Sequence, residues 1–371
     1  MQGTAKVPNK VARALEVIEK YYDGAVDWLA KLYDKESGGF YMAISGKEDP
    51  CMEPAIEMTC WGVNFLKTYT RAFDDMPDKF RTGIIEFMNS RQDKETGLYI
   101  DRQGVPNSRE VARNQAAALR ALGHFNAQTR YPHPTGTGAA CEAMALMPQY
   151  MSCREAYVDW IGSMDWDNNS WTAGDQAQSS LQYVNMLEPR EREEYKAALF
   201  DWLERRQFDS GFFSPNIDFN AASGAFKVGL IYLMCGRVLP NYDSIIDSIF
   251  QCYKVSSPRN PYFVRNPLST LAQIKDYSPQ ACQKIRERVE ENIDAILKGF
   301  GDFLCPDGGF CAERGKSMVS FGGVVGSHGL FEGDIDATLM MLTARRAIYN
   351  IFDEEPKPLD TAHFWQDIYG G

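Results

Sequence analysis

The sequence predicts an all-α protein in which six helical hairpins close into an (α/α)6 toroid, forming a single domain over residues 1–371. Three observations predict this fold. A turn in which glycine precedes an aromatic residue or leucine recurs along the chain. A helix of small and apolar residues follows each turn, and strand-like alternation of Val, Ile and Thr is scarce. With 44 % hydrophobic and 12 % aromatic residues, the chain can bury a large core.

The turn motif appears four times, each time after a helix end that carries an aromatic residue. It reads DWLAKLYDKESGGFY, EFMNSRQDKETGLY, DWLERRQFDSGFF and GFGDFLCPDGGF, with its last glycine at Gly39, Gly97, Gly211 and Gly309. The intervals of 58, 114 and 98 residues correspond to one unit and two near-double units. Two degenerate turns are therefore expected, near residues 159–175 and 256–268. Six units of roughly 50 to 60 residues each suit a helix pair with its loops.

Two kinds of helix alternate with these turns. Helices with small and apolar residues are predicted to form an inner ring: PAIEMTCWGVNFLKTY, REVARNQAAALRALGHF, AGDQAQSSLQYVNML, SGAFKVGLIYLMCG, NPLSTLAQIKDY and GDIDATLMMLTARRAIYNIF. Charged amphipathic helices, such as PREREEYKAALFDWLERRQ and SPQACQKIRERVEENIDAILKGF, are predicted to form an outer ring that faces water. The alternative is an open helical solenoid. The count of six units favours closure.

Composition limits the partners and the compartment. The formal charge is −11 with scattered Lys and Arg, so neither nucleic acid nor an anionic membrane is an expected partner. Nine irregularly spaced cysteines without a CxxC pair are interpreted as mostly reduced core residues of a cytoplasmic protein. No apolar signal core and no run of about 18 apolar residues occurs, so no integral membrane segment is expected. P-loop, GxGxxG, HExxH and GxSxG motifs are absent.

The turns SGGFY and DGGFC resemble those of the terpene cyclase and protein prenyltransferase toroid superfamily. Its class II cyclases, such as squalene-hopene cyclase, carry a DxDD motif followed by Thr, whose middle Asp protonates the substrate. DIDAT (334–338) is similar, with Ala337 in place of the final acid, and oxidosqualene cyclases also have a non-acidic residue there. The resemblance implies protonation-initiated cyclisation of an isoprenoid, with Asp336 as general acid and Asp334 beside it.

Two features depart from that superfamily. Class II active sites lie between two helical domains, and this chain has room for one. The zinc-dependent prenyltransferases fit less well, because the chain has only four histidines and no matching Asp-Cys-His ligand set. No metal ligands and no cofactor are therefore predicted, except Mg²⁺ if the substrate is a diphosphate.

The two acids can be explained in two ways. Protonating an alkene needs a carboxylic acid that stays neutral, and a neighbouring carboxylate and an apolar pocket both raise a carboxyl pKa. Residues two apart do not share a helix face, so Asp334 and Asp336 converge only if they lie on the entry loop or first turn, near Gly333. The structural alternative is Asp334 as N-cap, with Asp336 offsetting the positive end of the helix.

The other inner helices carry polar residues near their starts, and in a toroid these starts gather at one mouth. Cations there suit a diphosphate or a carboxylate, whereas amides, carboxylates and indole rings equally suit a sugar. Taken singly, each residue is more often a cap, a surface charge or a member of a salt bridge. The candidate substrate-binding residues are Glu57, Trp61, Arg113, Asn114, Asp175, Gln176, Trp171, Lys227 and Arg265.

The segment SMVSFGGVVGSHGLFEGD (317–334) is unusually rich in glycine. So much glycine is costly in conformational entropy, which indicates a loop that approaches other backbone closely or moves over the mouth. His328 is a candidate acid/base residue there, although a loop histidine is more often simply solvated. Glu332 is a further candidate for binding substrate.

Three functions follow from these patterns. The first is a terpene cyclase-like enzyme acting on an isoprenoid with Asp336 as general acid, which requires a deep aromatic pocket. The second is a carbohydrate-active enzyme, a glycoside hydrolase or a polysaccharide lyase acting on an acidic sugar, which requires an open polar cleft with two carboxylates. The third is a non-catalytic helical scaffold in which the acids are caps.

Overall fold

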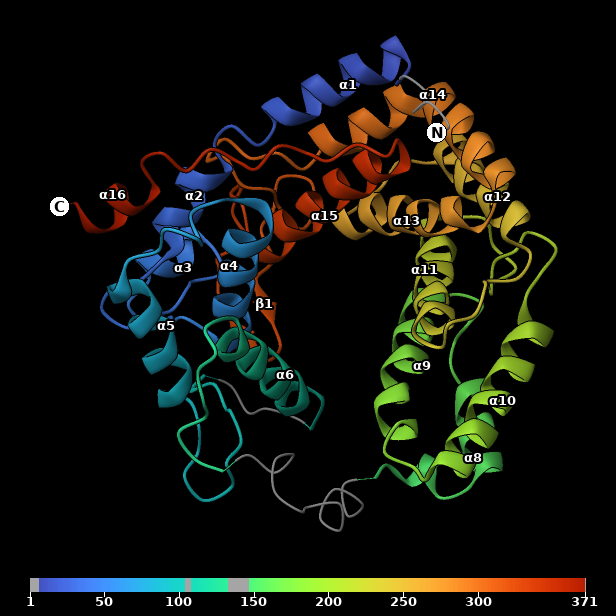
Figure 1. Cartoon of the computed structure of the whole chain (residues 1–371), viewed down its shortest axis with the longest axis horizontal. Helices are drawn as coiled ribbons and strands as arrows, with labels where there is room; N and C mark the ends of the chain where they lie inside the picture. Colours follow the sequence, from blue (N-terminus) through green and yellow to red (C-terminus); the bar gives the residue numbers. More distant parts are fainter. Residues whose placement is uncertain (1–6, 104–107, 133–146, 371) are drawn as a thin grey trace. The chain divides into compact units, whose positions relative to one another are not determined.

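The computed structural model describes residues 7–103, 108–132 and 147–370, and these residues are mostly helical (Figure 1). The predicted all-α class is confirmed. Contacts between residues divide the chain into two compact units. Unit 1 comprises residues 1–14, 144–299 and 343–355, and unit 2 comprises residues 15–143, 300–342 and 356–371.

Unit 2 contains the first helices of the chain and a short hairpin. Its elements are α2 (Ala25–Leu32), α3 (Ile44–Glu48), α4 (Ile56–Tyr69), α5 (Asp78–Ser90), α6 (Ser108–His124), β1 (Ser320–Phe321), β2 (Val324–Val325) and α16 (Phe364–Tyr369). Within it α4 packs against α6, α5 packs against α6, and α2 packs against α3 and α16.

Unit 1 contains the middle of the chain. Its elements are η1 (Gln149–Met151), α8 (Arg154–Gly162), α9 (Ser170–Val184), α10 (Pro189–Arg206), α11 (Phe219–Met234), α12 (Tyr242–Val255), α13 (Pro261–Ile274) and η2 (Lys275–Tyr277). Helix α11 packs against α9, α12 and α13. Three more helices carry residues of both units: α1 (Asn9–Lys20), α14 (Pro279–Gly301) and α15 (Ile335–Ile351).

The Gly-aromatic turns have a common backbone structure, which supports their interpretation as a repeat. In three of them a single antiparallel bridge closes the turn, pairing Tyr33 with Phe40, Gln92 with Tyr99 and Leu304 with Phe310. In the fourth, the Phe208 N–H donates to the Phe212 carbonyl at 2.9 Å. One glycine in each turn has a positive φ: Gly38, Gly97, Gly211 and Gly308. Where two glycines are adjacent, the first of them adopts this conformation.

Close packing explains why glycine is needed in these turns. A Cβ atom on Gly38 would lie 2.2 Å from the carbonyl oxygen of Gly83 in α5, and one on Gly308 would lie 2.6 Å from that of Gly24 before α2. Real Cβ atoms do not approach a backbone oxygen so closely. Each of these turns therefore packs directly on the backbone of a neighbouring segment.

The six predicted inner helices all form, but three of them begin earlier than expected. Helices α9, α11 and α13 begin after Asn169, Asp218 and Asn260, whose side chains accept hydrogen bonds from backbone N–H groups three residues on. These are N-caps. The short polar segments that were predicted to be degenerate turns thus include helix starts, and Trp171 lies on a helix.

The glycine-rich segment was predicted as a loop, and it contains a hairpin. Strands β1 and β2 pair in antiparallel register, with Ser320 opposite Val325 and Phe321 opposite Val324. Gly322 and Gly323 form the connection and both have positive φ, 58° and 81°. Two residues with positive φ are what a tight type I′ hairpin turn requires. The Gly-Gly pair between apolar residues was the sequence signal for this hairpin.

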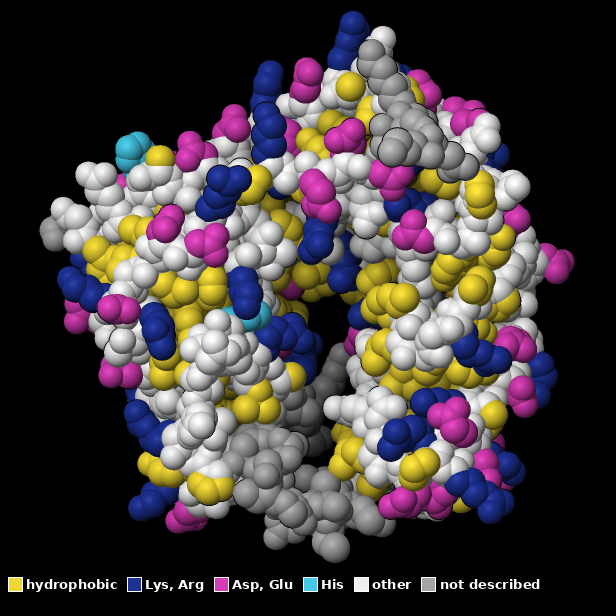
Figure 2. All heavy atoms as spheres, in the orientation of Figure 1, with side chains coloured by type: hydrophobic (Ala, Val, Ile, Leu, Met, Phe, Trp, Pro, Cys, Tyr) yellow, Lys and Arg dark blue, Asp and Glu magenta, His cyan; other side chains and the backbone are white. Residues whose placement is uncertain are grey.

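The charges on the surface are mixed in sign, as the scattered Lys and Arg of the sequence predict (Figure 2). In the face shown in Figure 2, basic and acidic side chains are interspersed. No helix of the described residues combines the length and the apolar character needed to cross a membrane.

Of the eight cysteines within the described residues, none is in a disulfide, and Cys60, Cys252, Cys305 and Cys311 are buried. Cys51 and Cys153 are exposed, so the expectation of core cysteines holds only in part.

Candidate functional site

Asp334 is the N-cap of α15 and is fully buried. Its Oδ1 accepts the N–H of Ala337 at 2.8 Å, and its Oδ2 accepts the N–H groups of Ala312 and Met318 at 2.9 and 3.0 Å. The cap predicted as the structural alternative is confirmed. The same carboxylate also fastens the start of the glycine-rich segment to the start of the helix.

Asp336 lies in the first turn of α15 and is 2 % exposed. Burial and, secondly, the neighbouring Asp336 carboxylate raise the pKa of Asp334 to about 8, while its backbone N–H donors act in the opposite direction. The two acids therefore lie close enough for their charges to interact, as the first-turn placement predicted. Whether Asp336 acts as an acid stays a prediction.

Glu332 is buried in a network of hydroxyl groups. Its carboxylate accepts the N–H of Ser45 at 2.9 Å and hydrogen bonds from the hydroxyls of Ser45 and Ser317. The Ser317 hydroxyl also contacts that of Ser327 at 2.9 Å. Because Ser317, Ser327 and Glu332 lie at both ends of the hairpin segment, this network attaches both ends to α3.

The imidazole of His328 lies outside this network. Its side chain is half exposed, and its Nε2 lies 3.1 Å from Oδ2 of Asp49. Its backbone N–H donates to the hydroxyl of Ser45 at 3.0 Å. The structure therefore places His328 in a surface pair with an acid, and it does not bring the imidazole together with Asp334.

The tip of the hairpin lies against the starts of α4 and α6. Arg113 donates from Nε to Oε1 of Glu57 at 3.0 Å, and its guanidinium lies 4.2 Å from the ring centre of Phe321. The Trp61 ring meets that of Phe321 edge-on at 4.8 Å. A Cβ atom on Gly322 would lie 2.8 Å from Oε2 of Glu57. The close approach predicted for the glycine-rich segment is thus observed, and its target is the Glu57 carboxylate.

Asp101 is a second buried carboxyl group at this place, and it is not among the residues that the sequence patterns predicted for the site. It is 8 % exposed, and its Oδ1 accepts the N–H of Ile56, the first residue of α4, at 3.0 Å. Burial raises the pKa of Asp101 to about 6, and the charge of Glu57 adds to the rise. Hydrogen bonds from Ile56 and Asn114 and the charge of Arg91 oppose it. The available signal was its position directly after the turn GLYI.

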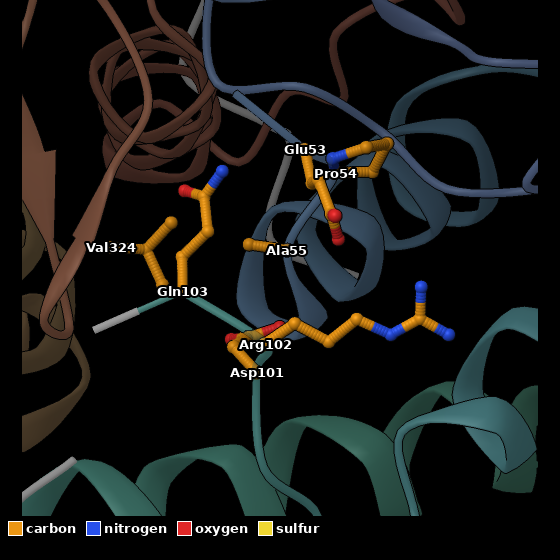
Figure 3. A pocket seen from close by; sticks show the side chains of 7 residues that line it. All are labelled: Glu53, Pro54, Ala55, Asp101, Arg102, Gln103 and Val324. Atoms are coloured by element: carbon orange, nitrogen blue, oxygen red, sulfur yellow. The ribbon is translucent and has the colours of Figure 1, made fainter. Parts of the chain in front are cut away.

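A small polar pocket adjoins Asp101 (Figure 3). Glu53 and Pro54 lie on one side, Asp101 and Arg102 on the other, and Gln103 and Val324 close a third side. The gap between these side chains is too narrow to hold a water molecule, so a substrate group could enter it only if the surrounding side chains move. Val324 belongs to the hairpin, so the hairpin contributes to the pocket.

Unit 1 holds the remaining predicted residues. Asp175 of α9 and Lys227 of α11 form an ion pair at 2.6 Å. Arg265 of α13 donates to the side-chain oxygen of Asn266 at 2.7 Å and lies over the ring of Phe226. In the same unit, the Trp171 ring lies 5.0 Å from the ring of Tyr262, and Gln176 is exposed.

The structure thus groups the predicted residues within units. Unit 2 holds Glu57, Trp61, Arg113, Asn114, His328, Glu332, Asp334 and Asp336, and unit 1 holds Trp171, Asp175, Gln176, Lys227 and Arg265. The single mouth shared by all of them stays a prediction. Among residues 7–103, 108–132 and 147–370, no group of three or more His, Cys, Asp and Glu side chains is arranged to hold a metal ion.

A comparison with protein-family models gives no match for this chain, and a comparison with curated proteins gives none. Function is therefore argued from the side chains themselves.

Proposed function

We propose that the chain is a glycoside hydrolase that acts on an acidic sugar. The observation that carries this proposal is the pair Asp101 and Glu57. One carboxyl group is buried with a pKa raised to about 6, and the other is held in an ion pair with Arg113. Two carboxyl groups whose surroundings differ in this way are the arrangement that acid/base chemistry at a glycosidic bond needs.

The roles follow from the surroundings of each carboxyl group. A pKa of about 6 leaves part of Asp101 protonated near neutral pH, so Asp101 is the general acid that protonates the departing oxygen. Glu57 accepts a hydrogen bond from Arg113 within an ion pair, so Glu57 is the base or nucleophile. A hydrolase with this pair inverts or retains the anomeric configuration according to the separation of the two carboxyl groups.

The cations near the site support an acidic sugar as the substrate. Arg102 is exposed beside the pocket, where it could pair with a substrate carboxylate by charge-assisted hydrogen bonds. Trp61 and Phe321 provide partly exposed rings at the neighbouring hairpin, and aromatic faces are suited to stacking on sugar rings.

The test is an assay of reducing ends released from uronate-containing oligosaccharides. Asp101→Asn and Glu57→Gln are the informative variants, because Asn retains an acceptor for the Ile56 N–H and Gln retains one for Arg113. We expect each to lower kcat by about 100-fold or more, since general acid/base groups typically contribute that much.

Glu95→Gln, an exposed change in a neighbouring turn, is the matched control and is expected to leave the rate unchanged. Absence of any released reducing end from the wild type on a panel of acidic oligosaccharides would overturn the proposal. Release with an unsaturated uronate absorbance would instead identify a lyase.

The second candidate is the terpene cyclase-like activity, and the burial of both Asp334 and Asp336 favours it. A neutral acid in a dry place is what alkene protonation needs. The three backbone N–H groups on Asp334 weigh against it, because they engage both oxygens of the carboxylate that would assist Asp336. Incubation with squalene and polyprenyl diphosphates should give cyclic products in the wild type and none in Asp336→Asn; no product in either would exclude this activity.

We also propose that the helix pairs close into the (α/α)6 toroid as one domain. The recurrence of the Gly-aromatic turn and the formation of all six predicted inner helices support closure.

A further inference from the structure

Two buried thiols lie together in the last Gly-aromatic turn, which contains neither Asp101 nor Glu57. Cys305 is 4 % exposed and Cys311 is fully buried. The turn that carries them is held by hydrogen bonds from the Cys305 N–H to the Gly309 carbonyl and from the Cys311 N–H to the Phe303 carbonyl, both at 2.9 Å. The backbone therefore fixes the two side chains relative to one another.

Both sulfur atoms converge on a single backbone oxygen. The Phe303 carbonyl accepts hydrogen bonds from both thiols, with Sγ of Cys305 at 3.6 Å and Sγ of Cys311 at 3.3 Å. The same oxygen accepts the Cys311 N–H, so it would keep a donor if both thiol protons were removed. Joining the two sulfur atoms would therefore leave no buried acceptor without a partner, which removes a common obstacle to a buried covalent change.

We propose that Cys305 and Cys311 are a thiol pair that a peroxide oxidises to an intramolecular disulfide. The Cys311 sulfur attacks one peroxide oxygen: an S–O bond forms, the O–O bond breaks, and the departing hydroxide takes up the thiol proton as water. The Cys305 sulfur then attacks the Cys311 sulfur. An S–S bond forms, the S–O bond breaks, and a second water leaves with the Cys305 proton. The thiols lose two electrons and the peroxide gains them.

The surroundings decide which thiol reacts first. Pairing with Cys305 and hydrogen bonds from the backbone N–H groups of Gly315 and Lys316 lower the pKa of Cys311, against the effect of burial. The same pairing with Cys311, together with burial, raises the pKa of Cys305. The thiolate is the reactive form. Cys311 is thus the attacking thiol and Cys305 the resolving one.

Oxidation would act on the helix that carries the two acids. The Asp334 N–H donates to the Phe310 carbonyl, and the Gly333 N–H donates to Oδ2 of Asp307, both at 2.9 Å. Both acceptors belong to the turn between the two cysteines. A disulfide that closes this short turn restrains it in the unfolded chain and so stabilises the start of α15.

The test is peptide mapping after hydrogen peroxide treatment of the full chain. Free thiols are then blocked with iodoacetamide in denaturant, and the chain is digested with trypsin. The peptide 299–314 contains both cysteines and no internal Lys or Arg. We expect it unblocked and lighter by about 2 Da than its reduced form, because two hydrogen atoms leave, and we expect reduction to restore two blockable thiols.

Two comparisons make the result decisive. Cys252, which is buried and has no cysteine partner in the described structure, should stay reduced and blockable. In Cys305→Ser the resolving thiol is absent, so Cys311 should accumulate as a sulfenic acid that dimedone labels, whereas the wild type should not be labelled there. A wild-type peptide with two blocking groups, or with Cys311 oxidised to a sulfinic acid, would overturn the proposal.

Discussion

Asp334 caps helix α15 and also holds two other backbone segments by hydrogen bonds. It accepts three backbone N–H groups from α15, from the turn before the hairpin and from the hairpin segment itself. A buried N–H left without an acceptor costs about 1 to 3 kcal/mol. The position is therefore more important for stability than an exposed helix cap.

We expect Asp334→Ala to lower the free energy of unfolding by roughly 3 kcal/mol or more, because three backbone donors, one buried and two partly buried, lose their acceptor. Urea unfolding followed by circular dichroism measures this. Asp78→Ala is the control: Asp78 is an exposed acid in the first turn of α5, and its loss should cost only a few tenths of a kcal/mol. Equal losses in the two variants would contradict the assigned role of Asp334.

The raised pKa of Asp101 predicts how the free energy of unfolding changes with pH. Its folded pKa of about 6 lies above the ordinary value of 3.8, so the native state binds this proton more tightly than the unfolded state. The resulting stability is present below about pH 4 and is lost as the pH rises through 6. Asp101→Asn has no proton to lose. Relative to wild type, its unfolding free energy should therefore rise by roughly 2 to 3 kcal/mol between pH 4 and pH 7.

Measurement of both proteins at several pH values tests this, because titrating groups that do not interact with Asp101 cancel in the difference. A difference that is constant from pH 4 to pH 7 would show that the Asp101 pKa is not raised.

Individual residues show how much of the candidate site the sequence could predict. The cap at Asp334 was predictable, because an acid directly before an apolar helical run is a local pattern. Asp101 was missed because its capped helix, α4, begins 45 residues earlier in the chain, and no local pattern links Asp101 to Ile56. The Glu332 network was missed for the same reason, since Ser45 is 287 residues away.

At the scale of elements, the β1–β2 hairpin is the part that most directly affects the candidate site. Its tip places Phe321 on Arg113 and Gly322 against the Glu57 carboxylate. Gly322 is needed both for its positive φ and for this close approach. The hairpin was predicted only as a loop, because two-residue strands are too short for alternation to reveal them.

Gly322→Ala tests the close approach. We expect it to lower the unfolding free energy by roughly 1 to 3 kcal/mol, from the strained backbone and from the contact with Glu57. Gly315→Ala is the matched control, because Gly315 also has a positive φ but a Cβ atom there would meet nothing within 4 Å. The difference between the two variants isolates the contact, and equal effects would argue that the tip does not press on Glu57.

Helix starts in unit 1 show a second limit of prediction. The apolar runs gave the existence and type of α9, α11 and α13, but the starts were set by Asn169, Asp218 and Asn260. Each of these caps lies in a polar stretch that also resembles a turn. Asn and Asp favour both turns and N-caps, so composition alone does not separate the two.

At the scale of the whole molecule, the toroid proposal predicts a compact particle. A single closed domain of 371 residues should have a radius of gyration of about 21 Å. Small-angle X-ray scattering of the monomer measures it. An open solenoid of the same length would be extended, with a clearly larger radius and an elongated distance distribution, and that result would overturn closure.

The buried carboxylate of Glu332 has a mechanical consequence for the segment that it holds. Ser45 of α3 and Ser317 donate hydrogen bonds to Glu332, and Ser327 is joined to them through the Ser317 hydroxyl, so the strand pair is held at both of its ends. Val319 and Val325 of this segment are exposed. Because the base of the segment is held, we expect its thermal motion to be largest at the tip. Because the tip lies against Glu57, such motion would alternately expose and cover the Glu57 carboxylate while the base of the segment stays in place.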